Sequence, residues 1–194
     1  MRIIITENQM RWLILEVGTE SSPKDKEEIE DKKNLTDKEK AEKSFNQLSD
    51  TEKIIVCTLL GEAGGEKKDP YKSMLAVANV LYNRSNANHL NKGTTLKDQS
   101  LAKKQFSMWN KYNSRGETLE DVYKKFKQHT QMENAISIIK NEEYKNKDVT
   151  KGAMFYYANY VSPYWSKDTA TTKWVHTTTI ETHIFGNVEK KTKK

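Results

Sequence analysis

The sequence predicts a single α+β domain that is mainly helical and ends in a small β portion. Helix-start signals recur along the first two thirds of the chain, and apolar residues at helical spacing follow them. After Gly152 the composition changes, because aromatic and β-branched residues that favour strands become frequent. The length of 194 residues leaves room for one ordinary domain and a short appendage, but not for two full domains.

The first 48 residues are expected to lie outside that domain. Thr6 and Gln9 form a capping-box pattern, and the apolar spacing after them predicts a short amphipathic helix within residues 1–19. Residues 20–48 are rich in charge and almost lack bulky apolar side chains, which is typical of a solvated linker or a loose helix. The N-terminal helix could contact a partner protein or pack back on the domain, and the sequence leaves both open.

The folded domain is expected to span residues 49–188, followed by a basic tail at residues 189–194. Ser49 and Glu52 form a second capping box, and the helix that begins there should end at Gly64-Gly65. Proline at the first helical position after Asp69 predicts another helix, through residue 84. Further helices are expected at residues 118–130 and 131–144, and strands within residues 153–161 and 174–186.

The net charge of +6 favours a polyanionic partner, such as nucleic acid, anionic lipid or bacterial cell wall, without choosing among them. Cys57 is the only cysteine, which excludes an intrachain disulfide and a cysteine-rich zinc module. No run approaches the roughly 18 apolar residues of a membrane helix, so no membrane span is expected. Charged residues interrupt the apolar N-terminus, so no Sec signal is expected either.

The stretch "GEAGGE", residues 61–66, places Glu62 in the last turn of an apolar helix. Burial and the negative end of the helix dipole both oppose ionisation and raise the pKa of such a carboxyl. A glutamic acid that stays protonated near neutral pH can act as the general acid of glycosidic cleavage. A solvent-facing residue at a helix end is the structural alternative. Glu66 is the second carboxylate, but the intervening glycines mean that helical spacing cannot be assumed.

The ordered motifs "GEAGGE", "AVANVLYNR", "QFSMW", "GAMFYYA", "PYW" and "THIF" resemble the SleB-type cell wall hydrolases, also called spore cortex-lytic enzymes. The resemblance covers residues 49–186. It implies a compact, mainly helical domain related to lysozymes and lytic transglycosylases, which cuts the glycan strand of peptidoglycan. It also implies that Glu62 is the catalytic acid. The more usual family motif has arginine where this chain has Gly64, so one charge near the site is missing.

The resemblance implies a reaction in which Glu62 protonates the oxygen that leaves N-acetylmuramic acid. The sugar's own 6-hydroxyl can then capture the cationic centre, which yields a 1,6-anhydro product and needs one carboxylate that switches from acid to base. Capture by water would need a partner carboxylate with space for water between the two. We favour the lytic transglycosylase route with Glu62 as general acid and base. A hydrolytic muramidase or glucosaminidase is the alternative.

Substrate contacts are expected from aromatic faces, which stack on sugars, and from amide, hydroxyl, imidazole and carboxylate groups, which bond ring substituents. The candidates are Glu66, Asn83, Gln105, Phe106, Ser107, Trp109, Tyr156, Tyr157, Trp165 and His183. Structural alternatives remain, because Phe106 and Trp109 could anchor their loop to the core, and Asn83 could be a structural tie. No cofactor or metal is expected, since the histidines lack metal-binding spacing.

Two rival functions remain open. A nucleic-acid-binding module fits the basic charge and interleaved aromatics but has no use for Glu62. A non-catalytic structural component of a phage particle would keep the fold and lose the activity. The expected partners are peptidoglycan glycan strands and not nucleic acid. The resemblance, together with the missing export signal, favours a phage-type lysin or virion-associated enzyme that acts on the bacterial cell wall.

Overall fold

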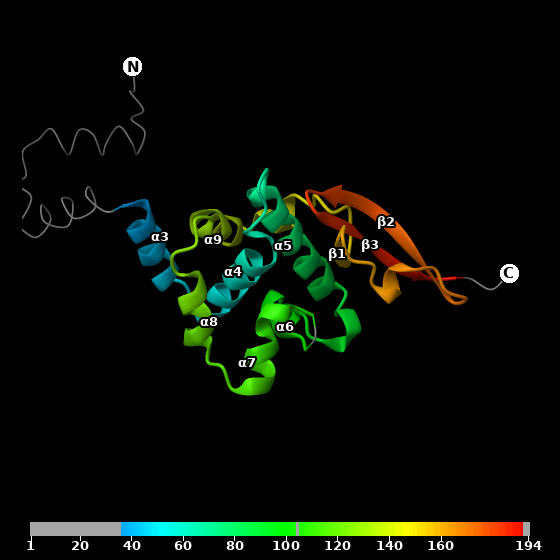
Figure 1. Cartoon of the computed structure of the whole chain (residues 1–194), viewed down its shortest axis with the longest axis horizontal. Coiled ribbons are helices and arrows are strands. Elements are labelled where there is room, and N and C mark those ends of the chain that lie inside the picture. Colours follow the sequence, from blue (N-terminus) through cyan, green and yellow to red (C-terminus); the bar gives the residue numbers. More distant parts are fainter. Residues whose placement is uncertain (1–35, 104, 192–194) are drawn as a thin grey trace, which may run out of the picture. The chain divides into compact units, whose positions relative to one another are not determined.

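Helices make up most of the computed structural model, which describes residues 36–103 and 105–191 (Figure 1). They are α3 (Asp37–Asn46), α4 (Asp50–Ala63), α5 (Pro70–Asn86), α6 (Leu96–Leu101), α7 (Asn110–Arg115), α8 (Leu119–Phe126), α9 (Met132–Lys140) and α10 (Glu143–Asn146). Single 3-10 turns lie at η1 (His89–Asn91), η2 (Ser107–Trp109) and η3 (Tyr164–Ser166). The strands are β1 (Phe155–Ala158), β2 (Thr172–Ile180) and β3 (His183–Lys190). The predicted mainly helical α+β class is confirmed.

Helix α4 begins where the sequence predicts, because its capping box forms. The Ser49 side chain accepts a hydrogen bond from the Glu52 backbone N–H at 3.3 Å, and the Glu52 carboxylate accepts one from the Ser49 N–H at 2.8 Å. Every residue from Ile54 to Leu60 is buried. Helices α5, α6, α8 and α9 pack around α4, so it forms the centre of the helical core.

The predicted end of α4 at the glycine pair is also observed. The Gly64 backbone N–H donates to the Leu60 carbonyl at 3.0 Å and closes the last turn. A Cβ added at Gly64 would lie 2.7 Å from that carbonyl oxygen and 2.8 Å from Cε1 of His129. Glycine is therefore required here by close approach, since its backbone conformation is an ordinary right-handed one.

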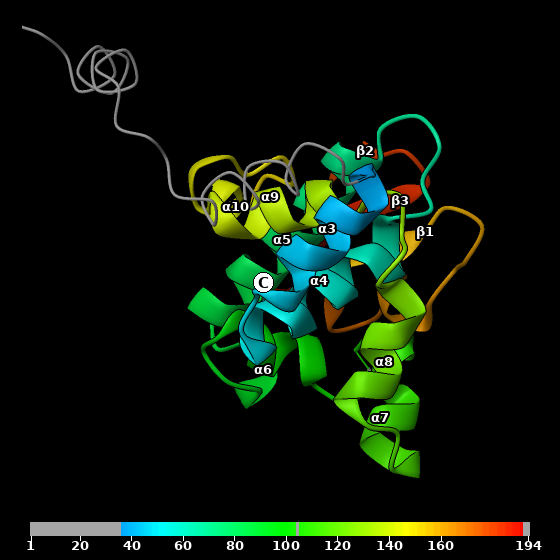
Figure 2. The same ribbon diagram turned by 90° about the vertical axis from the view of Figure 1, so that its left-hand side faces the viewer.

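Helix α5 contributes buried residues to two hydrophobic clusters, the main helical core around α4 and a smaller cluster between α5 and the sheet. Asp69 caps it by accepting from the Lys72 N–H at 2.9 Å, and Pro70 occupies the first turn. The helix continues to Asn86, so Arg84 lies within its last turn and not at its end. Figure 2 shows α5 behind α3 and α4 when the domain is turned by 90°.

The three strands form one antiparallel sheet in the order β1-β3-β2. Strands β2 and β3 form a hairpin, with a register shift between His176 and Thr178. Ile180 and Phe185 pack with Ala76 and Val80 of α5, so one face of the sheet covers that helix. Strand β1 pairs only with β3 and forms the other edge of the sheet.

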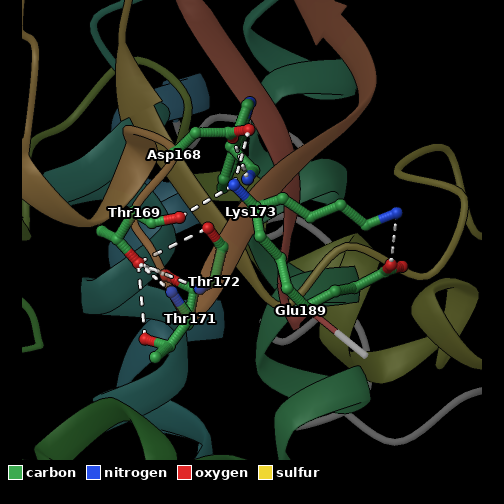
Figure 3. A network of polar contacts seen from close by, with 8 residues as sticks. Asp168, Thr169, Thr171, Thr172, Lys173 and Glu189 are labelled. Atoms are coloured by element: carbon green, nitrogen blue, oxygen red, sulfur yellow. Dashed lines mark hydrogen bonds and ion pairs between the residues drawn. The ribbon is translucent and has the colours of Figure 1, made fainter. Parts of the chain in front are cut away.

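A polar network fixes the segment that leads into β2 (Figure 3). Asp168 accepts from the Trp174 backbone N–H at 3.0 Å, and Thr169 Oγ1 accepts from the Thr172 N–H at 2.9 Å. Lys173 and Glu189 then pair across the hairpin at 3.2 Å. These contacts hold the entry of β2 against the end of β3.

The domain begins before the expected boundary at residue 49. Residues 37–46, placed in the linker by sequence, form α3, and Ala41, Phe45 and Leu48 are buried in the main core. Phe45 makes an edge-to-face contact with Tyr123 of α8, with ring centroids 5.7 Å apart. Ala41 and Phe45, four residues apart, bury one face of this otherwise charged helix, and Leu48 packs into the core just after it. The average composition of the segment does not reveal this face.

Other boundaries also differ from expectation. Strand β3 extends to Lys190, two residues into the segment expected as a tail. The expected N-terminal helix within residues 1–19 lies outside the described residues. Within residues 36–103 and 105–191, no helix has the length and apolarity needed to cross a membrane.

Candidate active site

A cleft of about 730 Å³ lies where the end of α4 and the last turns of α5 meet strands β1 and β3. Its wall is formed by Glu62, Arg84, Leu90, Gln105, Phe155, Tyr156, Tyr157, Ala158, Tyr160, Val161, Pro163, Tyr164, Trp165 and His183. Glu62 is the only carboxylate among these lining residues. The wall is otherwise largely aromatic, with one cation and one imidazole.

Glu62 is half-buried in the last turn of α4, where the sequence places it. The Tyr156 hydroxyl donates a hydrogen bond to Glu62 Oε2 at 2.8 Å. Burial raises the pKa of the Glu62 carboxyl, and the Tyr156 hydrogen bond and the positive charge of Arg84 oppose that rise. Glu62 is therefore held in an environment that favours its protonated form and still accommodates its carboxylate.

Tyr156 connects Glu62 to the sheet. Its ring lies 5.5 Å from the Phe185 ring and 5.3 Å from the His183 ring, measured between centroids. Burial raises the pKa of Tyr156 well above its usual value, and the Glu62 charge adds to the effect. The phenol is thus a fixed hydrogen-bond donor to Glu62.

Arg84 lines the cleft and was not among the substrate contacts predicted from the sequence. It is 5% exposed, and its Nε donates to the Met154 carbonyl at 2.6 Å. The guanidinium carbon lies 5.8 Å from the ring centroids of both Phe106 and Phe155. Its Nη1 is buried without a hydrogen-bond partner among the described residues. A buried cation lining the same cleft as Glu62 stabilises negative charge there.

Helix α4 ends at Ala63, so Glu66 lies outside it. The glycine pair at residues 64 and 65 led us to expect this. It accepts a hydrogen bond at Oε1 from the Thr182 hydroxyl, and the same oxygen lies 3.4 Å from His183 Nδ1. His183 is 8% exposed and lines the cleft. Burial lowers the pKa of His183, and the charge of Glu66 opposes that shift.

An aromatic cluster on the outer side of β1 supports one wall of the cleft. Trp165 packs against Phe155, Tyr157 and Trp174, with ring centroids 5.4, 5.6 and 5.6 Å apart. Tyr157 and Trp165 also line the cleft, as two of the predicted substrate contacts.

At the rim of the cleft, Tyr160 is 82% and Tyr164 is 84% exposed. Neither was among the predicted substrate contacts, although Tyr164 follows Pro163 in the "PYW" motif, which was a usable loop signal. Large aromatic side chains at this exposure have no packing role. They are available to cover the apolar face of a ligand.

The structure separates the predicted "QFSMW" contacts. Gln105 lines the cleft, but Phe106 and Trp109 are buried in the main core, and Trp109 Nε1 donates to Thr58 Oγ1 at 3.0 Å. These two rings anchor their segment to the core and have no surface for a substrate. Ser107 is exposed and does not line the cleft.

Asn83 also has a structural contact pattern. Its side-chain amide donates to the Ala153 carbonyl at 3.1 Å and to Asp148 at 3.3 Å, tying α5 to the segment before β1. It does not line the cleft. In the part of the chain that the structure describes, no group of three histidine, cysteine or acidic side chains could hold a metal ion.

Comparison with known proteins adds a family to this geometry. A family model described as cell wall hydrolase matches residues 68–186, which is more than half of the chain. The matched segment contains Arg84, the aromatic residues that line the cleft, and His183. It begins after Glu62 and Glu66, so these two residues lie outside the match. No curated protein and no solved structure matches the chain. With its helical core, C-terminal sheet and aromatic cleft, the chain belongs to the cell wall hydrolase family and is an enzyme that acts on peptidoglycan.

Proposed function

We propose that this enzyme cleaves the glycan strand of peptidoglycan between N-acetylmuramic acid and N-acetylglucosamine, with Glu62 as the general acid. The observation that carries the proposal is the half-buried Glu62, whose pKa is raised by burial and whose Oε2 accepts from Tyr156 within an aromatic cleft. A protonated carboxyl facing a sugar-sized cavity is what acid-catalysed glycoside cleavage requires.

In the first step Glu62 donates its proton to the glycosidic oxygen as the bond to C1 of N-acetylmuramic acid breaks. The sugar then carries oxocarbenium-like positive charge, and Glu62 becomes a carboxylate. Arg84 and the Tyr156 hydroxyl stabilise that carboxylate, because one places a positive charge in the cleft and the other donates a hydrogen bond. The same groups that limit the rise of the Glu62 pKa therefore help its proton to leave.

For the second step we propose capture by the 6-hydroxyl of the same sugar, which gives a 1,6-anhydro product. The support is the absence of a second carboxylate among the residues that line the cleft. An inverting hydrolase needs a partner carboxylate to hold the attacking water, whereas the 6-hydroxyl is already tethered to the reacting carbon. The Glu62 carboxylate can accept the hydroxyl proton, so one residue can serve as acid and base.

The remaining cleft residues fit glycan binding. Tyr157 and Trp165 on the wall and Tyr160 and Tyr164 at the rim offer aromatic faces for the C–H surfaces of sugar rings. Gln105 supplies an amide for an N-acetyl group or a ring hydroxyl. A helical domain with its acid at a helix end and a small antiparallel sheet across the cleft also supports the proposed lysozyme-like relationship.

Digestion of purified sacculi followed by mass spectrometry tests the proposal. We expect fragments that end in 1,6-anhydro-N-acetylmuramic acid, lighter by one water than hydrolysis products. We expect Glu62→Gln to abolish cleavage at unchanged fold, because the amide cannot donate the proton. Products with a reducing end would show that water captures the sugar in the second step, so that the enzyme is a hydrolase. Cleavage by a folded Glu62→Gln variant would remove Glu62 from the mechanism.

A further inference from the structure

Glu66, Thr182 and His183 form a polar cluster beside the proposed acid. The chain turns away from α4 at Gly64-Gly65 and brings Glu66 to the turn between β2 and β3. There the Thr182 hydroxyl donates to Glu66 Oε1, which lies 3.4 Å from His183 Nδ1. Both ionisable side chains are largely withdrawn from solvent, with 13% of the Glu66 side chain and 11% of the His183 side chain exposed.

This contact leaves one ring nitrogen of His183 for other partners. Nδ1 faces the Glu66 carboxylate, so the nitrogen at the opposite side of the ring is Nε2. His183 itself lines the cleft, together with Glu62. Its ring meets the Tyr156 ring edge-to-face at 5.3 Å, and Tyr156 donates to Glu62. One tyrosine thus separates the imidazole from the proposed acid.

We infer that His183 is the catalytic base of the second step, and that Glu66 is the positioning residue that holds its Nδ1–H so that Nε2 can accept the proton of the nucleophile. This inference rests on the proposed function and refines it, because acid and base become two residues. Glu62 gives its proton to the leaving oxygen as the C1–O bond breaks. The 6-hydroxyl oxygen then bonds to C1 and its proton goes to His183 Nε2. Solvent returns a proton to Glu62 and takes one from His183.

The charges around His183 suit this role. Burial lowers the pKa of His183, so the ring is neutral and able to accept a proton near pH 7. The negative charge of Glu66 stabilises the imidazolium once it has formed. The other titratable groups nearby are Tyr156 on β1, which stays a neutral phenol, and Glu62 on α4 and Arg84 on α5, which line the same cleft. The 3.4 Å contact of Glu66 Oε1 with Nδ1 places a carboxylate beside the imidazole, as in a catalytic triad, without the short hydrogen bond of that arrangement.

The test uses the full chain, a soluble peptidoglycan glycan as substrate, and four variants: Glu62→Gln, His183→Gln, Glu66→Gln and, as matched control, His176→Gln. His176 is exposed on β2 and contacts Thr179, away from the cleft. Thermal unfolding establishes that each variant is folded. Rates are measured across pH, and long-range ¹H–¹⁵N NMR spectra give the tautomer and pKa of His183 independently of activity.

We expect His183→Gln to lower kcat by about 10²- to 10⁴-fold and to remove the rise of the rate with pH. Glu66→Gln should lower kcat less and move that rise to lower pH, because losing the negative charge lowers the pKa of His183. The NMR spectra should show the Nδ1–H tautomer and the same downward pKa shift in Glu66→Gln. His176→Gln should match the wild type.

Other outcomes overturn the inference in distinguishable ways. If Glu62→Gln is inactive while His183→Gln keeps its rate, or loses rate with an unchanged pH profile, Glu62 alone serves as acid and base and His183 is a structural contact. If the NMR titration of His183 is unaffected by Glu66→Gln, the positioning role fails. If folded Glu62→Gln still cleaves the glycan, the proposed function itself fails and the inference falls with it.

Discussion

Replacing Tyr156 by phenylalanine isolates one hydrogen bond of the proposed active site. The hydroxyl donates to Glu62 Oε2 at 2.8 Å, whereas the ring contacts with Phe185 and His183 do not need the oxygen. The substitution therefore removes a donor and leaves the packing in place. Because the donor favours the carboxylate form, its loss should raise the pKa of Glu62 further above its ordinary value.

The size of the effect follows from the hydrogen bond and the exposure of its acceptor. A hydrogen bond to a charged group contributes about 1.5–3 kcal/mol, and one pKa unit corresponds to about 1.36 kcal/mol. The full range would give a shift of about one to two units. Glu62 is half-buried and partly screened by solvent, so we expect the lower end, about one unit.

A ¹³C NMR titration of the Glu62 side-chain carboxyl measures this shift directly. The loss of activity at high pH should move upward by the same amount, since Glu62 must be protonated to act. Tyr71→Phe is the matched control, because it removes a tyrosine hydroxyl that donates to Glu143, a residue outside the cleft. A pKa of Glu62 that stays the same or falls in Tyr156→Phe would refute the reasoning.

Three further predictions concern stability and binding. Burial raises the pKa of Glu62 above 4.5 in the folded state, so ionisation of Glu62 lowers the stability of the fold as pH rises from the unfolded-state pKa through the folded-state pKa. Glu62→Gln should therefore have a higher Tm than the wild type at pH 8 and not at pH 4. Equal differences in Tm at the two pH values would contradict this. Deleting residues 1–48 should destabilise the domain by about 3–5 kcal/mol more than deleting residues 1–35, because it also removes the buried Phe45, as measured by denaturant unfolding. Equal stabilities of the two shortened chains would contradict the contribution of α3 to the core. Tyr164→Ala should raise KM with little change in kcat or Tm, because the side chain is 84% exposed at the rim, and an unchanged KM would exclude it from substrate binding.

Local signals in the sequence predicted the helical centre of the domain because they act within a few residues. The capping box at Ser49, the proline after Asp69 and the glycine pair after Ala63 each satisfy or terminate backbone hydrogen bonds of their own helix. They fix where α4 ends, and so they place Glu62 in its last turn. The change to aromatic and β-branched residues near Gly152 likewise predicted the sheet.

Features that depend on tertiary packing were not predictable in this way. Arg84 is buried because two phenylalanine rings and the Met154 carbonyl surround it, and these come from separate parts of the chain. From the sequence, Phe106 and Trp109 could equally be core residues or substrate contacts. Their burial, and the hydrogen bond from Trp109 to Thr58, show that both belong to the core.

The close approach at the end of α4 links two positions 65 residues apart in the chain. The imidazole of His129 occupies the space that a side chain at Gly64 would need. A smaller residue at position 129 would remove this contact and leave the close approach to the Leu60 carbonyl oxygen. The cost of a substitution at Gly64 should depend on the residue at position 129, so the two substitutions should be non-additive. The residue at position 129 thus limits which side chains position 64 can accept, although the two positions lie far apart in the sequence.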